Sequence, residues 1–382
     1  MPAIKNGRMR TAIIHDWLTC MRGAEKCLEV FCELFPQADI YTLLHIPGAC
    51  SDQIESMNIH TSFIQHLPLS ASKYRNYLPL FPLAIERFKL KDYQLIISSS
   101  HCAAKGIIPP PEALHICYIH TPMRYIWDMF DEYFGADRTG FIKRALIAQF
   151  AVRLRVWDAA ASNRVDHFLA NSHHVRNRVW KYYRREASVV YPPVDTKFFQ
   201  PAAGKGDYYL MVSGLVPYKR IDLAIQAFNE LKRPLLIIGS GPEEKRLAGL
   251  DRFSGIEFMG RLNNEALKKY YQGCRALVFP GEEDFGIVPV EAMACGRPVI
   301  AYGRGGALET VIPPGKDHPP TGILFEEQNP DSLIKAVKEF EQREQEFDPG
   351  AIRGHAEKFD REIFKQKFQE SVKRHLQEMI KG

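Results

Sequence analysis

Residues 276–311, ALVFPGEEDFGIVPVEAMACGRPVIAYGRGGALETV, decide the fold, because short apolar runs alternate in them with polar, glycine-bearing loops. The apolar run 276–279 predicts a buried strand, and a second strand is expected at 299–301. Between them, the pattern at 288–295 predicts a short helix that Gly296 ends. Strands joined through helices are typical of parallel α/β sheets.

Two carboxylates and a helix start stand out in this stretch. Glu283 and Glu291 are separated by seven residues, with the first on a loop and the second inside the expected helix, so both can face one cleft. The segment Phe285-Gly286-Ile287 leaves unpaired backbone N–H groups at the helix N-terminus, which suit an anion. A glycine loop at 303–306 then opens another helix at Ala307.

This combination suits a sugar joined to a diphosphate. One carboxylate can accept hydrogen bonds from the vicinal hydroxyls of a ribose, and the other can fix the hydroxyls of a second sugar. Backbone N–H donors can hold phosphate without a metal ion, so no metal site and no cofactor is expected. The competing interpretation is an ordinary acidic surface loop before a core helix.

The same stretch resembles the signature of the retaining glycosyltransferases of family 4, which is Glu-x7-Glu with Phe-Gly and a following Glu-Ala-Met-Ala. The residues that fall into register are Glu283, Phe285, Gly286, Glu291, Ala292, Met293 and Ala294. The resemblance favours a donor site over the surface loop.

Length and composition set the class of protein. A chain of 382 residues suggests two domains, and 46% hydrophobic with 25% charged residues is typical of a soluble globular protein. No apolar run approaches the ~20 residues of a membrane span, and residues 1–9 have no apolar core of a secretory signal. Eight cysteines without a CxxC pair favour the cytoplasm and argue against disulfides or a zinc site.

The net charge of +5 is unevenly distributed. Residues 1–195 hold 23 Lys/Arg against 18 Asp/Glu, and the remaining residues hold 27 of each. This excess is too small and too dispersed for a nucleic-acid protein. It is compatible with an anionic membrane surface or a phosphate-bearing acceptor.

The first half begins with an expected strand at 11–14, a loop, and an amphipathic helix that ends at Leu34. Gly23, in the loop, is a candidate for backbone contact with a phosphate, although a simple tight turn is the more usual explanation of a single glycine. Relatives in the family carry two adjacent glycines here, and Arg22 occupies the first position. Close approach of a phosphate to Arg22 is therefore not expected.

His120 follows the expected strand 115–119, at the edge of the sheet where ligands of such folds bind. A lone histidine is usually structural. The segment 120–127, HTPMRYIW, also resembles the family, in which this histidine faces the transferred sugar. His120 is therefore a candidate catalytic residue.

Two parts of the first half allow two interpretations each. Residues 60–91 form either a cover packed on the domain or an interfacial surface for a membrane or an acceptor. One helix is expected at 140–161, and a second is expected to follow its cap, Ser172, and to end at Tyr183. Both carry basic residues that are either solvated or in contact with lipid head groups. The basic residues are Lys143, Arg144, Arg153, Arg155, Arg176, Arg178, Lys181, Arg184 and Arg185.

The second half repeats the alternation of strands and helices after a linker at 192–206. Its expected strands are 208–213, 235–238, 256–259, 276–279 and 299–301, and its expected helices are 221–231, 243–250, 331–347 and 361–380. By resemblance, Lys219 meets the donor diphosphate and Arg261 lies where relatives contact the base. Relatives often carry an arginine at the position of Gly214, and Arg220 is the candidate that replaces it.

The fold predicted is GT-B, with two Rossmann-like domains of doubly wound parallel sheets that face each other across a cleft. The expected domains are 1–195 on the acceptor side and 196–360 on the nucleotide-sugar side. By resemblance, 361–382 is a helix that crosses back to the first domain.

The activity that the resemblance implies is transfer of a hexose, with mannose from GDP-mannose as the expected donor, and retention of the anomeric configuration. The acceptor would be lipid-linked or an oligosaccharide, in surface polysaccharide or glycolipid synthesis, at the cytoplasmic face of a membrane. The expected catalytic residues are His120, Lys219 and Glu283. The expected donor-binding residues are Gly23, Lys219, Arg220, Arg261, Phe285, Gly286, Ile287 and Glu291.

Other classes of protein make different demands on the sequence. A dinucleotide-dependent oxidoreductase needs a GxGxxG after the first strand, and residues 14–25 have no such pattern. A non-catalytic sugar-binding or membrane-scaffold protein would not need the paired glutamates. An epimerase of the same architecture remains an alternative.

Overall fold

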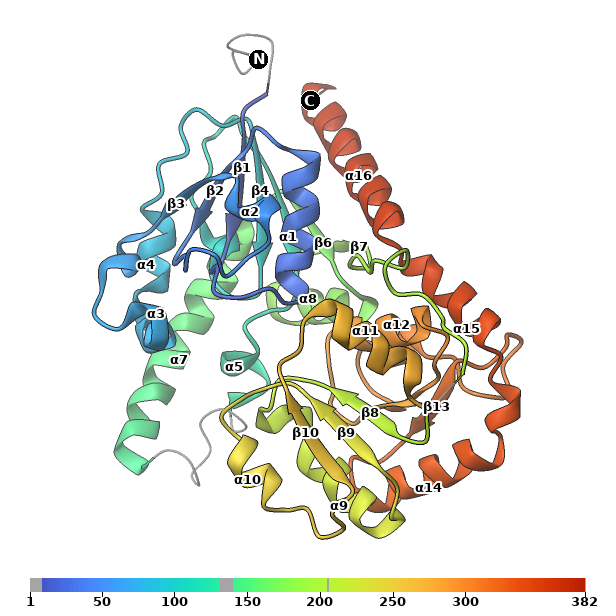
Figure 1. The fold of residues 1–382 in the computed structure, drawn as a ribbon. Coiled ribbons are helices and arrows are strands. Elements are labelled where there is room, and N and C mark those ends of the chain that lie inside the picture. The colour runs from blue at the N-terminus through green and yellow to red at the C-terminus, as the bar shows by residue number, and fades with distance from the viewer. Residues whose placement is uncertain (1–8, 131–139, 205, 382) are drawn as a thin grey trace. The chain divides into compact units, whose positions relative to one another are not determined.

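The computed structural model describes residues 9–130, 140–204 and 206–381, and within these the side chains of 141–143, 146, 380 and 381 are not described. The start of the chain, 1–8, and the side chain of Lys143 therefore lie outside the described residues. The chain divides into two compact units, each described by itself (Figure 1). Unit 1 comprises Met1–Pro193 with Phe364–Gly382, and unit 2 comprises Val194–Ile363.

In the described part of unit 1, seven parallel strands form one sheet in the order β3-β2-β1-β4-β5-β6-β7. The chain runs outward from β1 to β3 and then returns to place β4 on the other side of β1. Ligands of such sheets bind at the carboxyl ends of the strands where the order reverses. The strands are β1 (Thr11–His15), β2 (Asp39–Thr42), β3 (Asn58–Thr61), β4 (Leu95–Ser100), β5 (Leu114–Ile119), β6 (His167–Ala170) and β7 (Ala187–Val189).

Helices cover both faces of this sheet. The helices α1 and α16 pack on one face, where Phe31 of α1 lies 4.4 Å, between ring centroids, from Phe368 of α16. The other face carries α4, α5 and α7. The helices are α1 (Gly23–Leu34), α2 (Asp52–Glu55), α3 (Ser70–Lys73), α4 (Phe81–Glu86), α5 (Arg124–Trp127), α7 (Phe141–Ala161), α8 (His173–Tyr183) and α16 (Arg361–Lys381), with 3₁₀ turns at Phe63–His66, Tyr74–Leu80, Ala104–Gly106 and Ser162–Arg164.

The segment 60–91 packs as a cover on unit 1, in agreement with the first of its two interpretations. Tyr74, Phe81 and Ile85 are buried in the core beside Ile96 of the sheet. Its pattern has no single period because the chain changes between short α and 3₁₀ turns within a few residues. The cap predicted at Ser172 is confirmed, since its hydroxyl accepts a hydrogen bond from the Val175 N–H at 3.0 Å.

A buried ion pair connects four segments of unit 1. The ammonium of Lys105 contacts the carboxylate of Asp158, and both side chains are almost fully buried. Trp127 Nε1 and the Tyr183 hydroxyl donate to Oδ2 of Asp158 at 2.7 and 2.6 Å. Every partner of this carboxylate is thus a donor, which is what a buried charge requires.

Asp158→Ala should therefore lower the free energy of unfolding of unit 1 by about 3–5 kcal/mol, because it leaves a buried ammonium without its counter-charge. All four tryptophans of the chain, Trp17, Trp127, Trp157 and Trp180, belong to unit 1, so urea unfolding followed by tryptophan fluorescence measures this unit. The exposed Glu112→Ala is the control, with a change within about 0.5 kcal/mol. Equal effects of the two substitutions would contradict the role of the ion pair.

Unit 2 contains, among its described residues, six parallel strands in the order β10-β9-β8-β11-β12-β13. The order reverses between β8 and β11, which are neighbours in the sheet. The strands are β8 (Tyr209–Val212), β9 (Leu235–Ile238), β10 (Ile256–Gly260), β11 (Leu277–Phe279), β12 (Val299–Tyr302) and β13 (Gly322–Phe325). The helices are α9 (Ile221–Leu231), α10 (Glu244–Ala248), α11 (Asn264–Gly273), α12 (Ile287–Ala294), α13 (Ala307–Thr310), α14 (Pro330–Gln342) and α15 (Pro349–Ala356), with 3₁₀ turns at Pro217–Lys219, Glu344–Glu346 and Glu357–Phe359.

The prediction of two doubly wound parallel sheets is confirmed. The sequence analysis did not identify β3, β13, α11 and α15, and it extended α14 to Phe347, whereas the α-helix ends at Gln342. The edge strand β3, NIHT, is too polar and partly exposed to show an apolar run. In the described part of the chain, no helix is long and apolar enough to cross a bilayer.

Candidate functional site

The loop between β11 and α12 holds Glu283 at the carboxyl edge of the unit 2 sheet. Gly286 caps α12 with φ 85°, a conformation that favours glycine, and the helix begins at Ile287. The first-turn N–H groups have no acceptor within the helix, while Pro289 contributes none. Phe285 is buried against Phe359, with 5.5 Å between ring centroids, so its ring anchors the loop.

The glycine loop before α13 packs closely against the acidic loop that holds Glu283. A Cβ on Gly305 would lie 2.2 Å from the carbonyl oxygen of Glu283, and one on Gly306 would lie 2.3 Å from Cα of Phe285. The Gly306 N–H also donates to the Glu283 carbonyl at 2.8 Å. The sequence analysis found these glycines but not their partner, because the contact joins loops that follow two different strands.

Lys219 and Glu283 meet in unit 2, although 63 residues lie between them. Their ammonium and carboxylate form an ion pair, with the side chains 16% and 22% exposed. Lys219 follows β8 and Glu283 follows β11, so the reversal of strand order brings the two loops together. An anion that binds here gains a cation but must compete with the carboxylate.

Arg220 is held by other groups. Its backbone has φ 53°, and its guanidinium contacts Asp222 at 3.4 Å and donates to Gln328 Oε1 at 3.1 Å. Gln328 Nε2 in turn donates to the carbonyl of Pro280 at 2.9 Å. Arg220 thus ties its loop to the loop after β11, and a phosphate would have to share it with these partners.

Gly214 leaves room for a side chain, since no atom lies within 4 Å of a Cβ built on it. Gly214→Arg should tighten binding of a nucleoside diphosphate about tenfold, because one charge-assisted hydrogen bond contributes about 1.5 kcal/mol. Calorimetry measures the change. Gly214→Gln is the uncharged control, and equal affinity of the two variants would refute the prediction.

Glu291 is only 3% exposed and accepts a hydrogen bond from the hydroxyl of Tyr271, with 2.8 Å from that oxygen to Oε2. Tyr271, on α11, is fully buried, and burial together with the charge of Glu291 raises its pKa well above the ordinary value. Tyr271 was not predicted from the sequence, because α11 itself was not predicted. Arg261, by contrast, is exposed, directly after Gly260 at the end of β10.

In unit 1, Gly23 is the partly buried first residue of α1. The preceding Arg22 has φ −138°, an extended conformation that needs no glycine. Its N–H donates to the Glu25 carboxylate at 2.9 Å. The N–H of Arg22 is therefore already used within the first turn of α1.

His120 lies at the carboxyl end of β5 and is 8% exposed. Its Nε2 is 2.8 Å from Oγ of Ser99, and Asn171 donates to its backbone carbonyl at 3.0 Å. Burial, with smaller contributions from His101 and His15, lowers the pKa of His120 well below its ordinary value. The imidazole is thus neutral at physiological pH.

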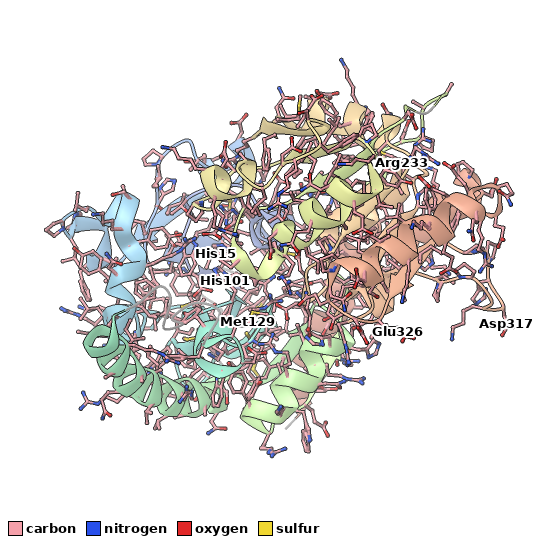
Figure 2. All side chains as sticks on the ribbon, turned by 90° about the horizontal axis from the view of Figure 1, so that it is seen from below. His15, His101, Met129, Arg233, Asp317 and Glu326 are labelled. Atoms are coloured by element: carbon pink, nitrogen blue, oxygen red, sulfur yellow. The ribbon has the colours of Figure 1, made fainter. Side chains whose placement is uncertain are left out.

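A polar network surrounds His120 at the ends of β1 and β4. His15 Nδ1 is 3.1 Å from Ser99 Oγ, and His15 lies 6.1 Å from His101 between ring centroids. Both histidines are labelled in Figure 2. The carboxylate of Asp16 accepts hydrogen bonds from the N–H groups of residues 101–104 at 2.6–2.9 Å. Asp16 thereby fixes the loop after β4.

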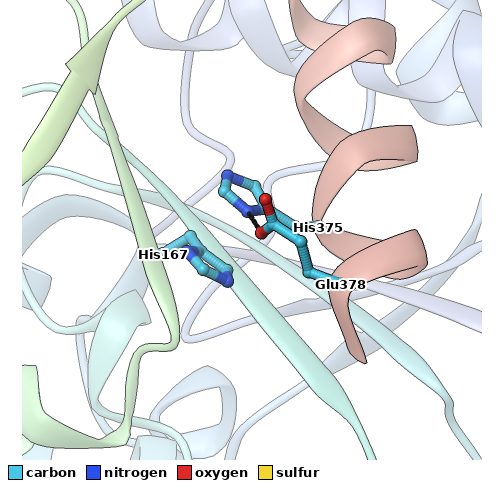
Figure 3. Close-up of side chains that lie close together, drawn as sticks. All are labelled: His167, His375 and Glu378. Carbon is cyan, nitrogen blue, oxygen red and sulfur yellow. Dashed lines mark hydrogen bonds and ion pairs between the residues drawn. The ribbon is translucent and has the colours of Figure 1, made fainter. Parts of the chain in front are cut away.

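One further group of unit 1 has the composition of a metal site: His167 with His375 and Glu378 of α16 (Figure 3). The two imidazole rings are stacked, with centroids 3.4 Å apart and planes 13° apart, so their in-plane nitrogen lone pairs lie in two nearly parallel, separate planes. Nδ1 of His375 contacts Glu378 at 2.8 Å, and Nε2 lies 3.3 Å from the guanidinium of Arg374. Such an arrangement does not direct two imidazoles at one ion.

Two family models match the chain. Residues 21–198 match the model described as Glycosyltransferase Family 4, and residues 194–353 match Glycosyl transferases group 1. Together they span the acidic loop, Lys219 and His120.

Curated relatives match over shorter stretches. The chain is 27% identical over 309 residues to the alpha-1,3/1,6-mannosyltransferase ALG2 of Saccharomyces cerevisiae, covering 66% of this chain and 58% of that protein. It is 36% identical over 142 residues to the GDP-mannose-dependent monoacylated alpha-(1-6)-phosphatidylinositol monomannoside mannosyltransferase of Corynebacterium glutamicum, covering 33% and 36%. The chain spans about half the length of the first curated relatives it matches, 55% and 58%.

Among solved structures, Anabaena HepE in complex with UDP and glucose superimposes with a TM-score of 0.70. The alignment covers 96% of this chain and 100% of that one, at 18% identity. At this identity, the likeness establishes the two-domain fold.

Proposed function

Because the chain belongs to the glycosyltransferases of family 4, with the GT-B fold, we propose that it moves a hexose from a nucleotide-sugar donor to a lipid-linked or oligosaccharide acceptor, with retention. The observation that carries the proposal is the pair of Lys219 and Glu283 at the strand-order reversal of unit 2. It offers a cation for the diphosphate and a carboxylate for sugar hydroxyls, a few residues from the N-terminus of α12.

In this proposal, the site residues contact different parts of the donor. Lys219, with Arg220, Gly23 and the N-terminus of α12 at Gly286 and Ile287, stabilises the diphosphate as its charge develops. Phe285 anchors the loop, Glu291 accepts from the ribose, Arg261 meets the base, and Glu283 and His120 contact the hexose. The acceptor oxygen attacks C1 on the face from which the phosphate leaves. The C1–O bond to phosphate breaks, and the leaving phosphate oxygen takes the acceptor's proton.

We propose mannose from GDP-mannose as the donor. This choice is supported by relatives named as mannosyltransferases, one of them GDP-mannose-dependent by name. The test is a panel of nucleotide sugars, with release of nucleoside diphosphate measured with and without added lipid-linked or oligosaccharide acceptors. GDP release from GDP-mannose, in EDTA as well as in magnesium, is expected.

Three outcomes would overturn parts of this proposal. Binding without any diphosphate release would indicate a sugar-nucleotide binder, and an isomerised nucleotide sugar without release would indicate an epimerase. Release from a different nucleotide sugar would replace the donor and leave the reaction class. Lys219→Ala serves as the control with strongly reduced activity.

We also propose that unit 1 binds an anionic cytoplasmic membrane surface. The segment 60–91 exposes Leu69 (64%) and Leu83 (53%), and it also exposes the basic residues Lys73 and Arg75, so it offers both apolar and charged attraction. Several basic residues considered from the sequence are instead structural. Arg178 is buried on Thr121 and Asp128, while Arg185 and Arg155 donate to backbone carbonyls within unit 1.

Replacing Lys73 and Arg75 by glutamine should weaken binding to anionic liposomes about 30-fold at low salt, because each basic residue contributes about 1 kcal/mol. Sedimentation with liposomes of rising anionic content, at low and high salt, measures it. The matched control is Lys335→Gln with Lys338→Gln, two exposed lysines of α14. Equal loss in both double variants, or binding that ignores salt and lipid charge, would contradict a specific face.

A further inference from the structure

Four buried side chains of unit 1 form one continuous hydrogen-bonded chain that ends at His120. Glu25 Oε1 is 3.3 Å from Nε2 of His15, Nδ1 of His15 is 3.1 Å from Oγ of Ser99, and the same Oγ is 2.8 Å from Nε2 of His120. His15 and Ser99 are fully buried, and Glu25 is 3% exposed. These hydrogen bonds lead from α1 across β1 and β4 to the end of β5.

The carboxylate at one end sets the direction of every hydrogen bond. An ionised carboxylate only accepts, so Nε2 of a neutral His15 carries the proton, and its Nδ1 is left as an acceptor. The Ser99 hydroxyl must then donate to His15, and its oxygen lone pair must accept from the N–H at Nε2 of His120. The remaining nitrogen of His120, Nδ1, is consequently unprotonated.

Glu25 is held in its charged form. Burial opposes ionisation, but the hydrogen bond from His15, together with a backbone hydrogen bond, keeps the pKa of Glu25 below its ordinary value. Its second oxygen accepts from the Arg22 N–H at 2.9 Å and closes the first turn of α1. The Glu25 carboxylate is thus fixed in position as well as in charge.

Nδ1 of His120 is available to a ligand. Within the described residues, no group forms a hydrogen bond with it, whereas Nε2 is taken by Ser99. The nearest aromatic neighbours are Tyr118 and His101, at 5.1 and 6.3 Å between ring centroids. An unprotonated imidazole nitrogen accepts a hydrogen bond, so it suits a hydroxyl and not a phosphate oxygen.

We infer that Glu25, His15 and Ser99 are positioning residues that hold His120 as the Nε2–H tautomer, so that Nδ1 accepts a hydrogen bond from a hydroxyl of the transferred hexose. The contact with the hexose rests on the proposed function. The tautomer rests only on the contacts within unit 1, and the two can therefore be tested separately.

Glu25→Gln provides the sharpest test, because it should reverse the direction of donation in each of these hydrogen bonds. The amide oxygen can keep the bond from the Arg22 N–H, which leaves the NH₂ group to donate to Nε2 of His15. His15 then carries its proton on Nδ1 and donates to Ser99, whose hydroxyl donates to Nε2 of His120. In this variant, Nδ1 of His120 should be protonated.

Nitrogen-15 NMR of histidine-labelled full-length protein reads the tautomer directly, with the His120 signals assigned by their loss in His120→Gln. We expect an unprotonated Nδ1 in the wild type, a protonated Nδ1 in Glu25→Gln, and a mixture in Ser99→Ala. Circular dichroism checks that the variants are folded. A protonated Nδ1 or a mixture in the wild type would overturn the inference, and so would an unchanged tautomer in a folded Glu25→Gln.

Kinetics test the contact with the sugar. Ser99→Ala should lower kcat/KM about tenfold in the wild-type background and leave it unchanged in a His120→Ala background, because its effect passes through His120. Equal losses in both backgrounds would overturn the positioning role. If no donor is turned over, the proposed function fails, whereas the NMR result on the tautomer stands or falls by itself.

Discussion

Glu291→Ala should reduce affinity for the nucleotide-sugar donor about 10²- to 10⁴-fold. The proposed role is acceptance of two ribose hydroxyl groups, and hydrogen bonds to a charged group contribute about 1.5–3 kcal/mol each. Calorimetry with the donor measures the loss. Unchanged affinity in a folded variant would refute the assignment.

Glu291→Ala has a second consequence, which follows from the tertiary contact of Glu291. Glu291→Ala also leaves the buried hydroxyl of Tyr271 without its acceptor, which costs about 1–3 kcal/mol of stability. Two variants separate the effects. Glu291→Gln keeps an acceptor for Tyr271 but removes the charge, and Tyr271→Phe removes the hydroxyl but keeps the carboxylate. Only the first should bind the donor weakly, and weak binding by Tyr271→Phe would mean that burial, not ribose contact, governs the site.

Lys219→Ala should lower kcat/KM about 10²- to 10³-fold, since the loss of one group that stabilises developing charge costs about 2.7–4 kcal/mol. The ion pair makes a companion measurement informative, because removal of Lys219 leaves the Glu283 carboxylate facing the diphosphate alone. Binding of the bare nucleoside diphosphate should therefore weaken as well.

Glu283→Ala is the matched control for Lys219→Ala. It removes the other half of the same ion pair, but its proposed partner is the hexose, so turnover should fall while the bare nucleoside diphosphate binds at least as tightly as to the wild type. Weaker binding of the diphosphate in Glu283→Ala would contradict this division of roles. Full activity in that variant would exclude a role of Glu283 toward the hexose.

The sequence by itself determined the architecture and the family. Alternation of apolar runs with helical patterns predicted both parallel sheets, because burial of strands between helices needs that order of residues. The Glu-x7-Glu register and the place of His120 after a strand were also visible, since both depend on neighbours along the chain. Short polar elements such as β3 escaped, because their side chains carry no apolar pattern.

Only the tertiary structure decided which of these groups meet. Lys219 pairs with Glu283 because strand order reverses between β8 and β11, and Ser99 joins His15 to His120 because β4 lies between β1 and β5. The tertiary structure also decided which charged side chains pair within the fold, such as Arg178 with Asp128. Local periodicity determines which face of an element is apolar, whereas the partner of a buried polar group comes from a distant segment.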